Sequence, residues 1–338
     1  MSGSPSLLPS IWMAILCFNI TLYVLLDGFS LGVGILFPWA RKEDDRSLMM
    51  ASVAPVWDGN QTWLVGGGAA LFTAFPKAFN LLGAVLYLPL MMMLLALVFR
   101  GVAFEFRFKA RRPELWSLAF TAGSTIAALC QGLVLGTFVQ GFRFDGSQLI
   151  SGPLGFITPF SIATALGVLL AYALLGSCWL ILKGEGSLKE WARQRARLLL
   201  PLVLATVALI CVWTPLAVPA IRERWFDWPN LILLSPIPIW TGVIAFVLNR
   251  LLHSDRWPDG MPFICCVGLY LMTLLGLVVS LWPFIVPRIF TFWQVAAPDD
   301  SLMFMLVGVL LIVPVILVYT GHAYYVFRGK VRIEDAYH

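Results

Sequence analysis

Two carboxylates stand out because they occur inside segments that are otherwise apolar. Asp27 lies in the apolar run 11–38 and Asp58 in the run 51–72, whereas the chain's other acids, of 18 Asp and Glu, fall in polar loops or near the ends of apolar runs. A carboxylate placed in hydrocarbon costs about 2.5–3.5 kcal/mol on insertion scales. Such a side chain is therefore expected to face the protein interior and to have a function.

The spacing of the two acids predicts a proton relay. If the two runs are neighbouring antiparallel helices, a rise of 1.5 Å per residue puts both carboxylates roughly 10–16 Å inside the same end. Two carboxylates in a low-dielectric site cannot easily both be ionised, so one of them is expected to hold a proton. The structural alternative is that Asp27, before Gly28, caps or kinks a helix, and that residues 58–60 form a turn.

The segment around Asp58 is unusually polar for an apolar run. Residues 55–63 read PVWDGNQTW. Its proline and glycine weaken a helix, and its amides offer hydrogen bonds that lipid cannot supply. The residues expected to line a proton path or a subunit interface are Trp57, Asn60, Gln61 and Trp63.

The elements that must position these residues are membrane helices. The 338-residue chain is 60% hydrophobic and only 12% charged, whereas soluble domains are about 25% charged. Runs of about 20 apolar residues suffice to cross a bilayer. We expect one all-α membrane domain with nine transmembrane helices, at 11–38, 51–72, 79–99, 115–139, 159–182, 199–219, 234–252, 262–286 and 302–327.

The positions of Lys and Arg predict the orientation. With the N-terminus outside (periplasmic) and the C-terminus in the cytoplasm, the outer segments of the chain hold only Lys77, Arg143, Arg222, Arg224 and Arg288 of its 23 Lys and Arg. This bias follows the positive-inside rule. The net charge of +5 is explained by cations in cytoplasmic loops, which orient the chain and face anionic lipid headgroups. No nucleic-acid partner is expected.

Cysteine and histidine are poorly placed for metal chemistry. All six cysteines fall inside the predicted helices and none forms a CxxC pair, so we interpret them as buried, inert thiols. Of three histidines, His322 alone lies near a helix end, where it is more typical of an interface residue than of a haem ligand. We expect neither a metal site nor a catalytic residue in this chain.

Three blocks of the sequence resemble subunit II of cytochrome bd-type quinol oxidases. Residues 26–34 read LDGFSLGVG, the block at 55–63 follows, and residues 100–107 read RGVAFEFR. They occur in the family's order and spacing, and the chain's length and nine runs fit the family too. Ser30 departs from the pattern, since the family often has a second Asp there, and a role for that carboxylate does not carry over.

The resemblance implies a complex that couples quinol oxidation to the reduction of dioxygen to water in the bacterial cytoplasmic (inner) membrane. In the family, subunit I holds two b-type haems and haem d, or a haem b in its place. Subunit II shares its nine-helix architecture, two four-helix bundles and a peripheral helix, and packs against it. A structural quinone in subunit II and a small single-helix accessory subunit also occur. The compact chain is similar to the cyanide-insensitive subgroup.

By the same resemblance, Asp58 would be a relay carboxylate on a path from the cytoplasm, with Asp27 as an assisting group. Arg100 and Glu105 would organise the cytoplasmic mouth of the path. Two other readings remain. A proton-coupled secondary transporter also uses buried acids and broken helices, but usually in both halves of the chain. A purely structural assembly scaffold predicts that both aspartates are dispensable.

Overall fold

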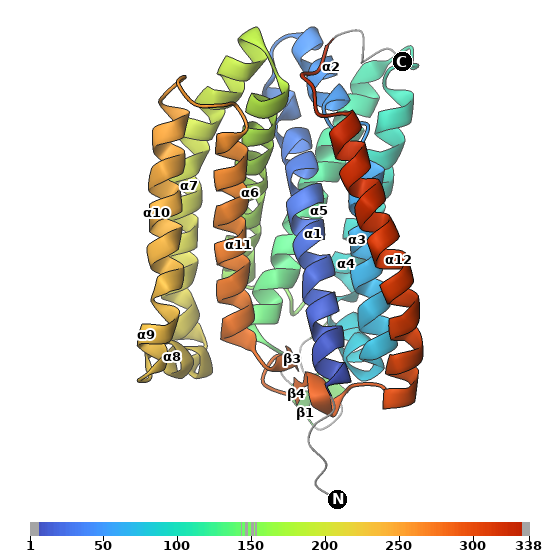
Figure 1. The fold of residues 1–338 in the computed structure, drawn as a ribbon, viewed down its shortest axis with the longest axis vertical. Helices are drawn as coiled ribbons and strands as arrows, with labels where there is room; N and C mark the ends of the chain where they lie inside the picture. Colours follow the sequence, from blue (N-terminus) through green and yellow to red (C-terminus); the bar gives the residue numbers. More distant parts are fainter. Residues whose placement is uncertain (1–6, 143, 146–147, 150–151, 153, 333–338) are drawn as a thin grey trace, which may run out of the picture.

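The computed structural model describes residues 7–142, 144–145, 148–149, 152 and 154–332. The fold is a bundle of long, roughly parallel helices with two small hairpins at one end (Figure 1). The elements are α1 (Leu8–Leu36), η1 (Phe37–Trp39), α2 (Glu43–Ala51), α3 (Trp57–Ala74), α4 (Pro76–Phe106), α5 (Pro113–Gln140), β1 (Phe144–Asp145), β2 (Gln148–Leu149), α6 (Pro159–Lys183), α7 (Gly186–Ala217), α8 (Pro219–Phe226), α9 (Asn230–Leu234), α10 (Pro236–Leu252), α11 (Met261–Leu281), β3 (Phe284–Val286), β4 (Phe290–Thr291), η2 (Phe292–Gln294) and α12 (Asp299–Val326).

Eight helical segments of the described chain are long and apolar enough to cross a bilayer. They are α1, α4, α5, α6, α7, α9 with α10, α11 and α12. α3 runs among them and packs on α1 and α4. It is not one of the eight, because Asp58 and its amide side chains make it less apolar than they are. The chain is therefore a multi-pass helical membrane protein.

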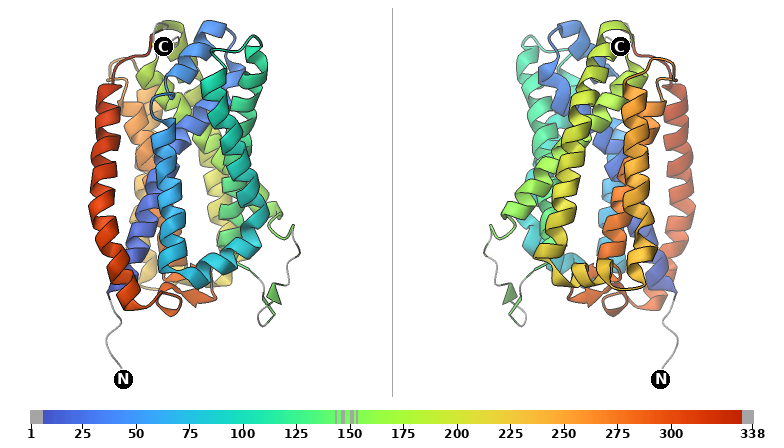
Figure 2. Two further views of the ribbon diagram at one scale, coloured as in Figure 1. Left: turned by 90° about the vertical axis from the view of Figure 1, so that its right-hand side faces the viewer. Right: turned by 90° about the vertical axis from the view of Figure 1, so that its left-hand side faces the viewer.

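The helices form two groups joined at α6. α1, α3, α4 and α5 pack together, and α6 packs on both α1 and α5. On its other side α6 contacts α7 and α11, which pack in turn with α10. α12 lies at the edge of the first group, beside α1 and α3 (Figures 1 and 2).

Glycines on α1 let α6 approach closely. The Tyr172 ring lies against Gly28, where an added Cβ would be 2.7 Å from Cε1 of Tyr172, and Gly32 lies against the Tyr172 carbonyl. Small residues permit such close helix contacts in membranes. This crossing brings Tyr172 to the same part of α1 as Asp27.

The predicted second helix, 51–72, is interrupted. α2 ends at Ala51, residues 52–56 form turns, and α3 begins at Trp57. Residues 58–60 are helical, so their interpretation as a turn is wrong. Pro55 lies in the interruption because it lacks the amide hydrogen that a helix interior needs. The predicted run 262–286 likewise ends as a helix at Leu281, and Phe284–Val286 pairs with β4.

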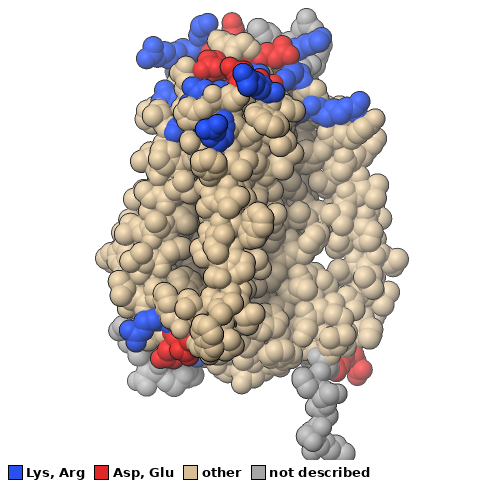
Figure 3. All heavy atoms as spheres, turned by 60° about the vertical axis from the view of Figure 1, so that its left-hand side comes forward, with Lys and Arg blue, Asp and Glu red and all other residues tan. Residues whose placement is uncertain are grey.

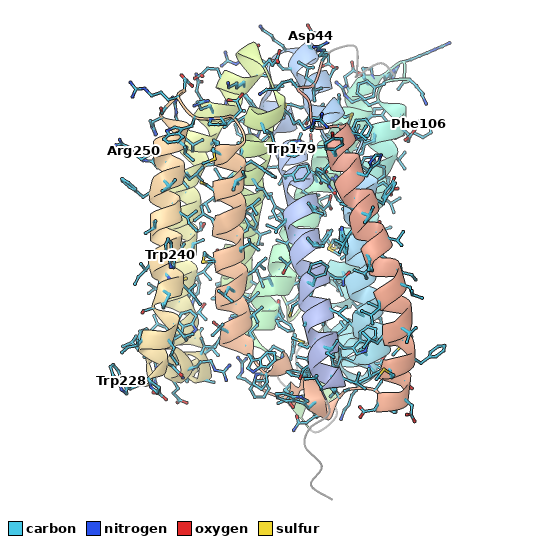
Figure 4. The ribbon with its side chains drawn as sticks, viewed as in Figure 1. Asp44, Phe106, Trp179, Trp228, Trp240 and Arg250 are labelled. Carbon is cyan, nitrogen blue, oxygen red and sulfur yellow. The ribbon has the colours of Figure 1, made fainter. Side chains whose placement is uncertain are left out.

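Charged side chains gather at one end of the bundle (Figure 3). This basic end holds the last turns of α1, α4 and α10 and the first turn of α7, and Arg250 and Asp44 mark it in Figure 4. Trp228 marks the opposite end, and Trp240 lies between the two. The first and last described residues lie at opposite ends.

Candidate functional site

An ion pair is buried in the first helix group. Arg100 Nη1 of α4 lies 2.9 and 3.1 Å from the two carboxylate oxygens of Asp27 on α1, and both side chains are 0% exposed. Arg100 Nη2 also donates to Ser30 Oγ, one turn after Asp27. Removing one partner of such a pair would leave an uncompensated charge in the interior. The pair therefore ties α4 to α1.

A hydrogen-bonded chain of uncharged side chains continues from Asp27. The Tyr23 hydroxyl, one turn earlier on the same face of α1, lies beside the carboxylate. Gln131 Nε2 of α5 donates to the Tyr23 hydroxyl over 2.8 Å, and the Tyr172 hydroxyl of α6 donates to Gln131 Oε1 over 2.6 Å. Three helices thus contribute to one polar cluster around Asp27.

Asp58 faces away from this cluster. The opposite face of α3 carries Asn60, which is two residues and about 200° further around the helix. Its Nδ2 donates to the Leu26 carbonyl over 2.9 Å. Asp58 is exposed. The expectation that Asp27 and Asp58 share one site is therefore not supported: α3 presents an amide to α1 and the carboxylate to a different surface.

That surface is a groove between α3 and α4 with a cavity of about 490 Å³. Asp58 and Glu105 lie towards its basic end, since the neighbouring Trp57 stacks on Phe104, with centroids 4.9 Å apart. Exposed apolar side chains form much of the wall, including Val65 (70% exposed) and Val98 (61%). The residues lining the groove are Trp57, Asp58, Gln61, Leu64, Val65, Leu94, Leu97, Val98, Gly101, Val102, Glu105 and Phe106.

Gln61 adds a hydrogen-bond donor to this groove. Its Nε2 is buried and has no partner among the described residues. A buried amide that lacks a partner costs free energy, so a water or a partner group is expected to complete it. Asp58, Gln61 and Glu105 together give an otherwise apolar groove a strip of hydrogen-bonding groups.

Asn60 and Trp63 do not line the groove. Asn60 is 1% exposed, and its Oδ1 accepts a 2.8 Å hydrogen bond from the Tyr324 hydroxyl of α12. Trp63 is 2% exposed and meets Phe18 of α1 edge to face, with centroids 5.8 Å apart. Both residues instead hold α3 against its neighbours.

Arg100 departs most from its expected place. We expected it at the mouth of a path with Glu105, but only Glu105 lies on the groove, whereas Arg100 is wholly buried against Asp27. The two residues are five apart on α4 and so about 140° apart around the helix. Their opposite environments follow from that angle.

Sequence reasoning missed Tyr23, Gln131, Tyr172 and Tyr324. Tyr23 is four residues before Asp27, a spacing that places both on one helix face and could have been noticed. The other three come from distant helices and carry no local signal. Among the described residues, no three His, Cys, Asp or Glu lie together as metal ligands.

Comparison with known proteins identifies similar chains. A family model described as cytochrome bd terminal oxidase subunit II matches residues 8–327. Cytochrome bd-I ubiquinol oxidase subunit 2 of Escherichia coli (strain K12) is 25% identical, over 96% of this chain and 95% of that one. Cytochrome bd ubiquinol oxidase subunit 2 of Bacillus subtilis (strain 168) is 27% identical, over 97% and 98%.

The fold is also similar to a solved structure. A chain of the bd oxidase from Geobacillus thermodenitrificans superposes with a TM-score of 0.77 at 18% identity. The match covers 93% of this chain and 98% of the other. The helix arrangement described above is therefore one that an experimental structure contains.

Proposed function

Because the chain belongs to the cytochrome bd terminal oxidase subunit II family, we propose that the groove beside Asp58 is the cytoplasmic entrance of a proton path. The chain is a subunit of a terminal quinol:oxygen oxidoreductase, which confirms the resemblance seen in its three sequence blocks. The path would deliver protons to a partner subunit I in which dioxygen is reduced.

The partner, not this chain, would hold the haems. Both described histidines, His253 and His322, are exposed, and His253 Nδ1 lies 2.8 Å from the Asn249 carbonyl at a helix end. Neither environment resembles the enclosed pocket that axial haem ligation requires. We propose that subunit I supplies two b-type haems and haem d, or haem b in its place, and oxidises the quinol.

One observation carries the proton path: Asp58 is an exposed carboxylate on an apolar, membrane-level face. Bare lipid over this carboxylate would be costly. A partner helix lying over the groove would cover the exposed apolar walls and enclose Asp58, Gln61 and Glu105 with water. The α3–α4 face is therefore our candidate for the surface that contacts subunit I.

The reaction itself needs such a path. Reducing dioxygen to water consumes protons, and a side chain that takes up and releases a proton at ambient pH can speed such transfers by about 10²–10⁴-fold. Asp58 would take protons from water at the basic end, and Glu105 would gather them at the mouth. Asp27 assists from the interior, through Arg100 and α4.

The position of the basic end also predicts how the chain is oriented in the membrane. We propose that α3 crosses as a ninth helix, with the basic end in the cytoplasm and the N-terminus outside, in the bacterial inner membrane. A structural quinone in this subunit and a single-helix accessory subunit stay predictions of the family resemblance. Family membership does not favour the secondary transporter.

The test is Asp58→Asn in the complex with its partner. We expect quinol-driven oxygen uptake to fall by about 10²-fold or more, while the haem spectrum and subunit stoichiometry stay unchanged. The matched control is Asp44→Asn, an exposed acid on α2 that should leave uptake unaltered. Normal oxygen and proton uptake by an assembled Asp58→Asn complex would refute the relay.

A further inference from the structure

The acid buried beside Arg100 has surroundings unlike those of a proton carrier. Asp27 accepts two hydrogen bonds from Arg100 Nη1, and the Tyr23 hydroxyl lies beside its carboxylate. It is 0% exposed and is not among the residues that line the groove. The guanidinium at this distance favours the charged form of the carboxylate, because an opposite charge in direct contact stabilises it.

The direction of each hydrogen bond in the cluster is determined. An ionised carboxylate can only accept, so the proton of the neighbouring Tyr23 hydroxyl is expected to point to Asp27. Tyr23 must then accept from Gln131, which requires the Nε2 of the amide to face it. The Oε1 consequently faces Tyr172, whose hydroxyl donates to it. Every donor in this chain points towards Asp27.

This arrangement is poorly suited to conducting protons. Gln131 has an amide at neutral pH, which does not exchange its protons along a chain as a carboxyl or imidazole does. It separates the two tyrosine hydroxyls, so no continuous series of ionisable groups joins Asp27 to Tyr172. The cluster holds the Asp27 charge in place, and its series of ionisable groups ends at Gln131.

The fixed charge is connected to the groove through α4. The Arg100 guanidinium lies 5.8 Å from the centroid of the Phe104 ring, and Phe104 stacks on Trp57 at the groove. Gly101, next to Arg100, contacts the same indole, since an added Cβ there would lie 3.0 Å from it. The ion pair thus sets where α4 and Trp57 stand beside Asp58.

We propose that Asp27 is a positioning residue, a permanent counter-ion of Arg100 held by Tyr23, Gln131 and Tyr172, and that it carries no protons itself. This inference rests on the proposed function, because it assigns the proton traffic to the Asp58 groove alone. It also names three residues, on α1, α5 and α6, that maintain the counter-ion.

A neutral replacement of the pair tests the proposal. Asp27→Asn alone strands the Arg100 charge, so we expect poor assembly with subunit I. The double variant Asp27→Asn/Arg100→Gln removes both charges, and neutral replacements of buried pairs are often well tolerated. We expect the Asn and Gln amides to hydrogen-bond in place of the ion pair and to keep α4 in position, so that assembly returns and oxygen uptake and protons taken up per oxygen stay near wild type. An assembled double variant that has lost proton uptake would overturn the proposal.

Tyr23→Phe is an independent test that leaves the ion pair intact. If no proton passes through the cluster, its oxygen uptake should stay within about twofold of wild type, far from the 10²-fold loss of a removed relay. The control is Tyr87→Phe, whose ring is 60% exposed on α4. A large loss of turnover in Tyr23→Phe with normal haem content would show that protons do use this route.

The two proposals can fail separately. If Asp58→Asn proves normal, the groove is not the proton entrance, yet rescue of assembly by the double variant would still identify Asp27 as a counter-ion. If Asp58→Asn lowers proton uptake and the assembled double variant lowers it too, the groove remains the proton entrance, but Asp27 must itself carry protons.

Discussion

Gly176 of α6 faces Gly32 of α1 at the helix crossing, where a Cβ added to Gly176 would lie 2.5 Å from the Gly32 carbonyl carbon. The two backbones therefore touch. No side-chain rearrangement can make room there, because the neighbouring atoms belong to the main chain. The position of Tyr172 beside Gly28, and hence its hydrogen bond to Gln131, depends on this contact.

Gly176→Ala is expected to destabilise the subunit by about 1–3 kcal/mol, the usual cost of overpacking, or more. Thermal denaturation of the purified complex, followed by haem absorbance, measures the change. The control is Gly83→Ala in α4, where an added Cβ meets nothing within 4 Å; it should lie within about 0.5 kcal/mol of wild type. Equal stability of the two variants would contradict the close crossing.

Arg100→Gln alone should cost about 3–5 kcal/mol, because it strands the Asp27 carboxylate in the interior. The yield of haem-containing complex and its unfolding temperature report the loss. Arg111→Gln, at an exposed position beyond the end of α4, is the matched removal of a cation and should change stability by no more than about 0.5 kcal/mol. A fully stable Arg100→Gln complex would mean that the charges are not enclosed.

Tyr324→Phe removes one hydroxyl and leaves the Asn60 Oδ1 acceptor without its partner. We expect a loss of about 1 kcal/mol and faster proteolysis of the chain after α12. The control is Tyr325→Phe, which makes the same chemical change at the next residue, whose side chain is 63% exposed. Identical digestion of the two variants would argue against a link between α12 and α3.

A lysine–aspartate cluster closes the basic end and predicts a pH dependence. Asp259 Oδ1 lies 2.7 Å from Lys189 Nζ and its Oδ2 2.7 Å from Lys330 Nζ. Burial raises the pKa of Asp259, but hydrogen bonds and charge from the two lysines outweigh burial and hold that pKa below its usual value. The carboxylate therefore stabilises the fold above the unfolded pKa of about 3.9, and this contribution is lost as the pH falls through the lower folded value.

Asp259→Asn should accordingly lower the unfolding temperature at neutral pH. The difference from wild type should persist down to about pH 4 and shrink below it. Unfolding temperatures measured across this pH range provide the check, with the exposed Asp44→Asn as control. A difference that does not change with pH would show that Asp259 does not act through its charge.

The length of the apolar runs predicts most of the long helices, but it does not predict which side chains one helix turns towards the next. The run 159–182 becomes α6, whereas 51–72 divides at residues 52–56, which contain a proline that a helix interior does not accommodate. The three sequence blocks identify the family correctly. Asp27 and Asp58 are both singled out by their cost in hydrocarbon, but depth alone cannot say which way each faces around its helix.

The partners of Asp27 illustrate what a sequence cannot supply. Arg100 resembles any cation near a helix end, and the direction of its side chain depends on how α4 packs on α5 and α3. Gln131 and Tyr172 occur in ordinary apolar runs, and the close packing of α6 on both α1 and α5 brings them together. Three-dimensional packing, rather than composition, determines those hydrogen bonds.

The hydrogen bonds of Asn60 carry a consequence for biogenesis. One of its partners, Leu26, has already been synthesised when Asn60 enters the membrane, but Tyr324 follows 264 residues later. Until α12 has been synthesised, the amide oxygen lacks this partner and is left to water. The Asn60 oxygen, two residues from Asp58, is therefore satisfied only when α12 has packed against α3. A product that ends before α12 would leave this polar atom without its protein partner.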